Sequence, residues 1–350
     1  MYHMNRLARA LMLGGLCVFG ASACNQSQTP AAGSSNTGAS SATSTAASGQ
    51  KTVDITAIVE HPALDAVRQG VMDELAQEGF KDGQNLKVNF QSAQGNTATA
   101  GQIAKQFVAE NPDVIVAIAT PSAQSVAAAT RTIPVVFSAV TDPVEAKLVP
   151  SWEASGTNVT GASDQLPLAP QIDLMKQIIP NLKTVGYVYS PGEVNSTIVQ
   201  KQLESQLGAQ GIKLIAVPAQ RSTDIAPAAR SLQGKVDVIY TSLDNNVVSA
   251  YESLYQAAKE SKIPLIASDT DSVKRGAVAA LGVDYHRLGQ ETGKIVGRIL
   301  KGEAAGSIKP YTMQDLDLYL SPTHAQEVGI TLAPELIGRA KVVEPTGNSK

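Results

Sequence analysis

Polar side chains that can bind a small charged molecule occur where predicted strands end. Thr120, Ser122 and Gln124 follow the apolar run 113–119, and Pro121 stands where a first helical residue would be. We expect Thr120 to cap this helix, whose free N–H groups attract anions together with the two hydroxyls and the Gln124 amide. The segment therefore predicts a carboxylate-binding site. The alternative is that Thr120 serves only as a cap.

Four acidic residues stand at the ends of other predicted strands: Asp142, Glu193, Asp244 and Asp269. A carboxylate in such a place can hold an ammonium group, because charge-assisted hydrogen bonds are the stronger class. Asp269 and Asp244 are the preferred candidates, followed by Glu193. Asp142 precedes a proline, a common turn pairing, and is assigned a structural role. Each acid can instead cap a helix or pair with a basic residue.

Further candidates lie beside these acids. Asn195 and Ser196 open a helix after a Pro-Gly turn, and Asn245 opens another, so all three can contact a ligand in addition to capping. Tyr189, the last residue of its strand, is the preferred aromatic candidate for the pocket. The other aromatic residues at strand positions fit a core role: Phe137, Tyr187, Tyr240 and Tyr285.

The elements that must position these residues form two series of similar plan. Short β-branched runs alternate with helical patterns, and a glycine ends the first helix of each series, at Gly79 and Gly211. Such alternation is typical of βαβ units with a parallel sheet, which bind ligands beyond the carboxyl ends of the strands. The predicted strands are 55–59, 86–90, 113–118 and 133–138, then 185–189, 214–217, 236–240 and 263–267.

This pattern predicts an α/β fold with two Rossmann-like, doubly wound parallel-sheet lobes and a ligand cleft with a hinge between them. We expect the segment 157–161, which has turn composition, to cross to the second lobe. The expected boundaries are 53–160 and 282–315 for the first lobe, 161–281 and 316–343 for the second, and 344–350 for a tail.

The start of the chain predicts processing rather than folding. Residues 1–23 combine Arg6 and Arg9 with a short apolar run, and they end in Ala-Ser-Ala before Cys24. We expect a lipoprotein signal peptide and lipidation of Cys24; the alternative is an ordinary secretory signal cut near Ala23. Residues 24–52 add a Ser, Thr and Ala-rich linker, which suits a tether to a membrane.

Composition and spacing favour binding over catalysis. The formal net charge of −3 argues against a nucleic-acid partner. His61, His286 and His324 have no metal-like spacing, and no Gly-x-Ser-x-Gly elbow occurs. Residues 289–294 imitate a phosphate loop but fall one residue short, so they indicate a packed helix. We expect no enzyme activity, no metal and no cofactor.

Together these segments resemble the type I periplasmic solute-binding proteins of ABC importers, in particular the lipoprotein branch associated with tryptophan and other aromatic amino acids. The resemblance covers about Val53 to Val343. It rests on residues 120–124, 141–148, 158–161, 190–196, 244–250, 267–269 and 282–285. The branch has Asn where this chain has Ser190.

The resemblance implies an exported, membrane-anchored monomer that captures a small solute in the cleft between the lobes and delivers it to an ABC permease and its ATPase. It favours an amino acid as solute, such as tryptophan or phenylalanine. Two alternatives stay open: a solute-sensing lipoprotein that docks on a signalling receptor, or a binder of a sugar or nucleoside.

Overall fold

A computed structural model of the protein describes residues 49–343. The expected signal peptide, Cys24, the linker up to residue 48 and the tail 344–350 lie outside this range. The first strand begins at Lys51, shortly before the expected start of the first lobe at residue 53. Within the described range, no helix is both long and apolar enough to cross a membrane.

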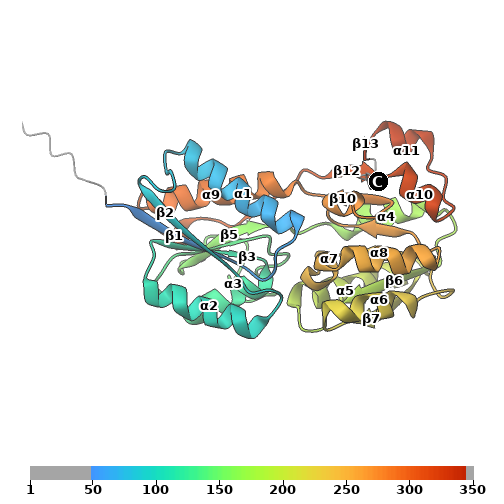
Figure 1. Ribbon diagram of the computed structural model, residues 1–350, viewed down its shortest axis with the longest axis horizontal. Coiled ribbons are helices and arrows are strands. Elements are labelled where there is room, and N and C mark those ends of the chain that lie inside the picture. The colour runs from blue at the N-terminus through green and yellow to red at the C-terminus, as the bar shows by residue number, and fades with distance from the viewer. Residues whose placement is uncertain (1–48, 344–350) are drawn as a thin grey trace, which may run out of the picture. The chain divides into compact units, whose positions relative to one another are not determined.

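The first lobe is built on a parallel sheet with the strand order β11-β5-β4-β3-β1-β2 (Figure 1). The sequences of the central strands are continuous apolar runs, which is expected where helices cover both faces of a sheet. Strand β3 is buried along its whole length. The strands are β1 (Lys51–Ala57), β2 (Leu86–Ser92), β3 (Val114–Ile118), β4 (Val135–Ser138), β5 (Val159–Ser163) and β11 (Tyr311–Thr312).

Four helices cover this sheet, with α1 and α9 on one face and α2 and α3 on the other (Figure 1). A Cβ atom at Gly289 of α9 would lie 2.1 Å from the Val67 carbonyl oxygen of α1, so only glycine permits this close packing. The expectation of a packed helix at 289–294 is thereby confirmed. The helices are α1 (Pro62–Gln77), α2 (Thr97–Glu110), α3 (Thr120–Ala129) and α9 (Tyr285–Leu300), with the 3-10 turn η3 (Ala305–Ser307).

The second lobe has the strand order β13-β12-β10-β9-β8-β6-β7. Its strands pair in parallel except β12, which runs antiparallel to β10. The strands are β6 (Thr184–Tyr189), β7 (Lys213–Pro218), β8 (Val238–Thr241), β9 (Leu265–Ala267), β10 (Ala279–Gly282), β12 (Asp317–Leu320) and β13 (Lys341–Val342).

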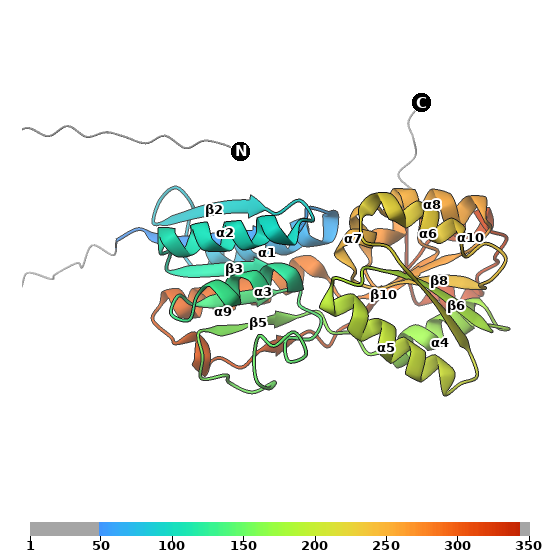
Figure 2. The ribbon, with the colours of Figure 1, turned by 90° about the horizontal axis from the view of Figure 1, so that it is seen from below.

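Helices also cover both faces of the second sheet, with α6 and α8 on one face and α4 and α5 on the other (Figure 2). The helices are α4 (Leu168–Ile178), α5 (Val194–Gly208), α6 (Ile225–Arg230), α7 (Asn245–Ser249), α8 (Tyr251–Glu260), α10 (Pro322–Glu327) and α11 (Pro334–Gly338). The 3-10 turns are η1 (Ser222–Asp224) and η2 (Asp271–Val273).

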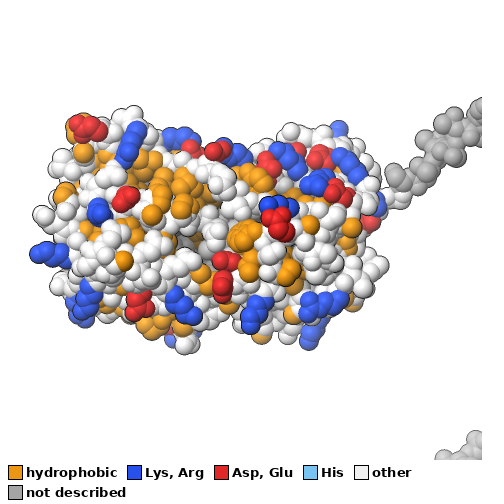
Figure 3. Space-filling view, turned by 180° about the vertical axis from the view of Figure 1, so that it is seen from behind, with side chains coloured by type: hydrophobic (Ala, Val, Ile, Leu, Met, Phe, Trp, Pro, Cys, Tyr) orange, Lys and Arg blue, Asp and Glu red, His pale blue; other side chains and the backbone are white. Residues whose placement is uncertain are grey.

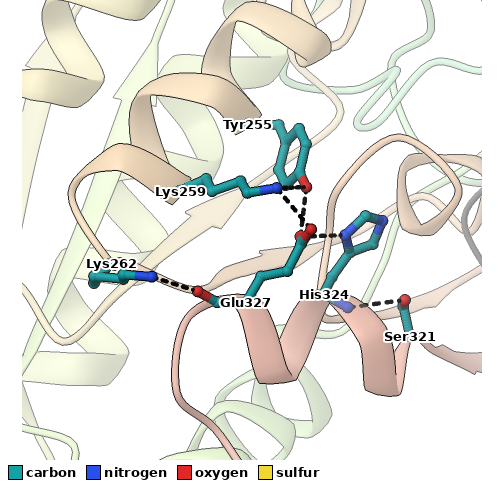
Figure 4. A network of polar contacts seen from close by, with 6 residues as sticks. All are labelled: Tyr255, Lys259, Lys262, Ser321, His324 and Glu327. Atoms are coloured by element: carbon teal, nitrogen blue, oxygen red, sulfur yellow. Dashed lines mark hydrogen bonds and ion pairs between the residues drawn. The ribbon is translucent and has the colours of Figure 1, made fainter. Parts of the chain in front are cut away.

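A polar network fastens α10 to α8 in the second lobe (Figure 4). The Glu327 carboxylate accepts hydrogen bonds from the Tyr255 hydroxyl at 2.5 Å and the Lys259 ammonium at 2.6 Å. It also lies 2.9 Å from Nδ1 of the buried His324. These contacts join segments nearly seventy positions apart in the chain and anchor the C-terminal helices to the lobe.

The chain passes between the two sheets after β5, after β10 and between β11 and β12. The predicted doubly wound α/β architecture is confirmed. The expectation that residues 157–161 form a turn that crosses between the lobes is wrong: Val159–Ser163 is strand β5, paired with β4 in the first sheet. The small and polar residues of β5 lack the usual composition of a strand, so the sequence did not indicate one. Gly161 is required there because a Cβ atom would lie 2.1 Å from the Phe137 carbonyl oxygen.

The surface carries charges of both signs. On the face seen from behind, basic and acidic side chains are interspersed over both lobes, with hydrophobic side chains between them (Figure 3). A nucleic-acid-binding surface would instead gather basic residues along one face. The visible face therefore offers no such surface.

Candidate ligand-binding site

A narrow cavity of about 20 Å³ lies between the lobes, beyond the carboxyl ends of β4 and β5 in one sheet and β8 and β9 in the other. This is where doubly wound sheets place their ligands. Its walls combine acidic, amide and apolar side chains from both lobes. They are formed by His61, Ala63, Leu64, Ala139, Asp164, Leu243, Asn245, Val248, Asp269 and Tyr285.

Asp164 is the acid of the cavity whose hydrogen bonding is incomplete. It directly follows β5 and is buried, with Oδ2 accepting a hydrogen bond from the Tyr285 hydroxyl at 3.1 Å. Its Oδ1 is also buried and has no hydrogen-bond partner in the protein. Burial raises the pKa of this carboxyl from 3.8 to about 6, against the opposing effects of the Tyr285 hydroxyl, its own backbone N–H and the Thr141 hydroxyl. An unpaired buried acceptor of this kind is a candidate contact for a ligand donor.

Asp269 faces the same cavity from the second lobe, two residues after the end of β9. Its carboxylate accepts hydrogen bonds from the Ser272 backbone N–H at 2.9 Å and from the Ser272 hydroxyl at 2.6 Å. Burial raises its pKa, although these bonds oppose the shift. Burial and the charges of Asp164 and Asp269 together raise the pKa of the Tyr285 hydroxyl well above its usual range. The charges of Asp164 and Asp269 therefore both act on the Tyr285 hydroxyl.

His61 lines the cavity from the start of α1, where Nδ1 accepts a hydrogen bond from the Leu64 N–H at 3.5 Å. Burial, followed by the charge of Arg275, lowers the pKa of His61 to about 3, so its ring is neutral at physiological pH. Within the described range, no lysine or arginine lines this cavity. The cavity is thus electrostatically suited to a cationic group.

The first turn of α3 follows β3, the strand next to β4, and its Pro121 lines a second crevice between the lobes, whereas Thr120 and Ser122 do not line the cavity. Thr120 is the first helical residue rather than the cap. The expected capping by Thr120 is wrong, because Ala119 occupies the cap position with φ +73° and makes no side-chain cap bond. The hydroxyls of Thr120 and Ser122 are buried without a hydrogen-bond partner. Two such hydroxyls beside free helix N–H groups are suited to an anion.

Gln124 and Tyr189 already have other contacts. The Gln124 amide donates to the Ala146 carbonyl at 3.1 Å. The ring of Tyr189 stacks on Tyr187 with their centroids 5.7 Å apart, and it packs against the core of the second lobe. Neither side chain lines the interlobe cavity.

Asp244 organises the strand ends of the second lobe. Its carboxylate accepts the Ser190 N–H at 2.6 Å, the Ser190 hydroxyl at 2.9 Å, the Ser196 hydroxyl at 2.5 Å and the Val247 N–H at 2.9 Å. Four donors occupy the carboxylate and hold the starts of α5 and α7 together. The Ser196 hydroxyl is therefore already bonded to Asp244 within the second lobe.

Glu193 binds the amides of the neighbouring turn. Its Oε2 accepts from the Asn245 side chain at 2.7 Å, the Asn245 N–H at 3.1 Å and the Asn195 side chain at 3.0 Å. Burial, with the nearby Asp244 carboxyl, raises the pKa of Glu193 well above its usual range. Glu193 also lines a second crevice between the lobes, opposite Pro121. Asn245 connects this cluster to the cavity.

Of the residues predicted from sequence, the structure thus places Asn245 and Asp269 on the cavity wall and Glu193 on the adjoining crevice. Sequence reasoning missed Asp164 and His61 and assigned Tyr285 to the core. Asp164 could have been found as a strand-end acid like the others, had β5 been recognised as a strand. His61 gave only the weak signal of a polar residue before a helix-opening proline.

The fold and this interlobe site define a solute-binding protein, and comparison with known proteins identifies the family. The chain belongs to the ABC transporter substrate-binding protein family, whose model matches residues 52–344. It is 39% identical to the "Tyrosine-binding protein" of Clostridioides difficile over 272 residues, which cover 78% of this chain and 79% of that protein.

Solved structures of related proteins cover most of the chain. A conserved domain protein from Vibrio cholerae is 45% identical, with a TM-score of 0.83, and the match covers 84% of this chain and 99% of that one. A Streptococcus pneumonia domain in complex with L-Trp is 33% identical, with a TM-score of 0.81, covering 84% of this chain and all of the other.

A third relative is known in a ligand-free, open structure: a substrate-binding protein with adhesive properties from Clostridium difficile. It is 37% identical, with a TM-score of 0.65, and the match covers 85% of this chain and all of the other. The protein thus resembles the L-Trp complex more closely in structure than the open form, despite the lower sequence identity.

Proposed function

We propose that this protein captures an aromatic amino acid between its lobes, which separate to widen the narrow cavity, and delivers it to an ABC permease. The observation that carries the proposal is the cavity itself. It is formed by both lobes at the carboxyl ends of their strands and holds buried acids, one with an unpaired oxygen. Two relatives support the ligand class: one is named a tyrosine-binding protein and the other contains L-Trp.

The surroundings of the cavity offer partners for each part of an amino acid. The first turn of α3, with the unpaired hydroxyls of Thr120 and Ser122, supplies donors for the carboxylate. The acidic wall supplies acceptors for the ammonium group. Leu64, Leu243 and Val248 supply apolar surface for a side chain. Apolar surface combined with a few placed polar groups is typical of small-molecule sites.

Thermal unfolding of the purified protein in the presence of single amino acids tests this proposal. A ligand at a hundredfold excess over its Kd stabilises the protein by about 2.7 kcal/mol. We expect L-tyrosine, L-tryptophan or L-phenylalanine to raise the unfolding temperature, and D-ribose and uridine to leave it unchanged. Stabilisation by the sugar or nucleoside alone would refute the amino-acid assignment.

We also propose that Cys24 is lipidated after removal of residues 1–23 and that the protein is held outside the membrane by this anchor. The motif before Cys24 and the uncharged linker that follows support this placement. Mass spectrometry of the membrane-extracted protein should show a diacylglyceryl-modified N-terminal Cys24. Recovery of the same peptide unmodified in a soluble extracellular fraction would refute the anchor.

A further inference from the structure

We propose that Asp164 is the residue that recognises the ligand's ammonium group and so makes the protein select amino acids over acids that lack the amine. This inference rests on the proposed function and names the selecting residue of the same site. Asp164 lies at the point where the chain leaves the first lobe, and it faces the cavity shared with the second lobe.

The hydrogen bonding of the acids near the cavity separates their roles. Both oxygens of Asp269 are bonded to Ser272, and those of Asp244 accept four donors. Oδ1 of Asp164, in contrast, is buried and makes no hydrogen bond of good geometry in the protein, although the Thr141 hydroxyl is close enough to lower the pKa of the carboxyl. Leaving a buried carboxylate oxygen unpaired is costly, so a donor supplied by the ligand recovers that free energy. Asp164 therefore gains more from a ligand ammonium than either other acid does.

The surroundings of Asp164 favour a cation over a neutral donor. Asp269 adds negative charge on the opposite wall, and the His61 ring is neutral, so neither side chain competes for the carboxylate. Arg275, whose charge acts on His61 and Asp269, is bonded to Glu252 at 2.6 Å rather than to a cavity acid. A primary ammonium can thus approach Asp164 without displacing a protein cation.

Tyr285 acts as a positioning residue for this contact. Its hydroxyl donates to Oδ2 of Asp164 and leaves Oδ1 directed to another donor. The phenol sits in the first turn of α9, whose N-cap Asp284 accepts the Arg287 N–H at 3.0 Å. The carboxylate is therefore held by a rigid element, which is the arrangement that gives a binding site its selectivity.

Calorimetric titration with paired ligands tests the role of Asp164. The ligands are L-tyrosine with 3-(4-hydroxyphenyl)propionate, and L-tryptophan with indole-3-propionate; in each pair the second compound lacks only the amine. In the wild-type protein we expect the amino acid to bind at least about thirtyfold more tightly than its partner. Asp164→Asn should weaken amino-acid binding by a similar factor and leave the affinity for the deaminated partner within about threefold.

The matched control is Asp173→Asn, which makes the same change at an exposed position on α4. It should leave both affinities unchanged. Undiminished discrimination in the folded Asp164→Asn protein would overturn the assignment of Asp164 while leaving the proposed function intact. If the wild-type protein binds none of the aromatic amino acids, the proposed function fails, and the inference fails with it.

A measurement on the wild-type protein covers the case in which Asp164→Asn does not fold. Titration at pH 6 in buffers of different ionisation enthalpy reports the protons released on binding. An ammonium that pairs with Asp164 should release about half a proton, because burial holds the pKa of this carboxyl near 6 in the free protein. The deaminated ligand should release none. Equal proton release by both ligands would overturn the inference.

Discussion

The Tyr285 hydroxyl and the Asp164 carboxylate, 3.1 Å apart, join two of the points at which the chain passes between its lobes. Asp164 follows β5, the strand from which the chain leaves the first lobe, and Tyr285 begins α9, with which the chain returns. Both side chains line the interlobe cavity. The segments that connect the lobes and the candidate ligand site therefore share residues.

Replacement of Tyr285 by Phe tests this relationship. The change removes the hydrogen bond that lowers the pKa of Asp164, so this pKa should rise further and the carboxyl should hold its proton at higher pH. We expect amino-acid affinity at pH 7 to fall by about 1.5–3 kcal/mol, the range for a hydrogen bond to a charged group. Calorimetry over pH 5.5–8 should show the acid limb of the affinity profile shifted upward. An unshifted profile would contradict a positioning role.

The pH dependence of the wild-type protein follows from the same carboxyl. Its pKa is near 6 in the free protein, and a bound ammonium lowers it, so binding is favoured above pH 6 and lost as pH falls. We expect the affinity measured by fluorescence titration to drop by up to about tenfold per pH unit below this value. Constant affinity between pH 7.5 and 5 would rule out a titrating contact.

Other groups around Asp164 need separate controls in this experiment. His61 stays neutral because its pKa is about 3, and Tyr285 stays protonated because its pKa is raised. Asp269 also has a raised pKa, with Arg275 opposing the shift. Asp269→Asn should keep the acid limb of the affinity profile, whereas Asp164→Asn should remove it. The reverse result would move the titrating contact to Asp269.

Asp244 is expected to matter chiefly for stability. Asp244→Ala leaves the donors on Ser190, Ser196 and Val247 without their acceptor inside the second lobe. Each unpaired buried donor costs about 1–3 kcal/mol, so urea unfolding should show a loss of about 3 kcal/mol or more. The exposed control Asp173→Ala should change stability little. If Asp244→Ala keeps wild-type stability and loses only ligand affinity, Asp244 is a ligand contact after all.

The network of Glu327 should make part of the stability depend on acid pH. Partial burial opposes ionisation, yet hydrogen bonds from His324, Lys259 and Tyr255 outweigh it and lower the pKa of Glu327 from 4.5 to about 2. Because the pKa is lower in the folded state, this stabilisation is complete above about pH 4.5 and is lost as pH falls toward 2.

Glu327→Gln should therefore reduce the free energy of unfolding by about 1–3 kcal/mol at pH 7. Urea unfolding at pH 7 and pH 3 measures this difference, which should shrink at the lower pH. A matched substitution, Glu145→Gln on an exposed position of the first lobe, should show no such trend. A difference that stays constant with pH would show that the variant acts through packing alone.

The sequence allowed the fold to be predicted well because its signals are local. Buried β-branched runs and glycine-ended helices mark the βαβ units. In the first sheet β5 and the two-residue β11 were missed, β5 because Gly161 and its small neighbours lack a strand's usual composition. The site was harder to predict. Asp244 and Asp164 are both strand-end acids, and only the three-dimensional structure shows that one is saturated by four donors and the other keeps a free oxygen.

A crystal structure of the protein with L-tyrosine or L-tryptophan is the most direct test of the proposed site. It should show the ligand between the lobes, with its ammonium nitrogen about 2.7–3.2 Å from Oδ1 of Asp164. The ligand carboxylate should lie at the first turn of α3, near Thr120 and Ser122. An amino acid bound outside the interlobe cavity, or with its ammonium turned away from Asp164, would contradict this arrangement.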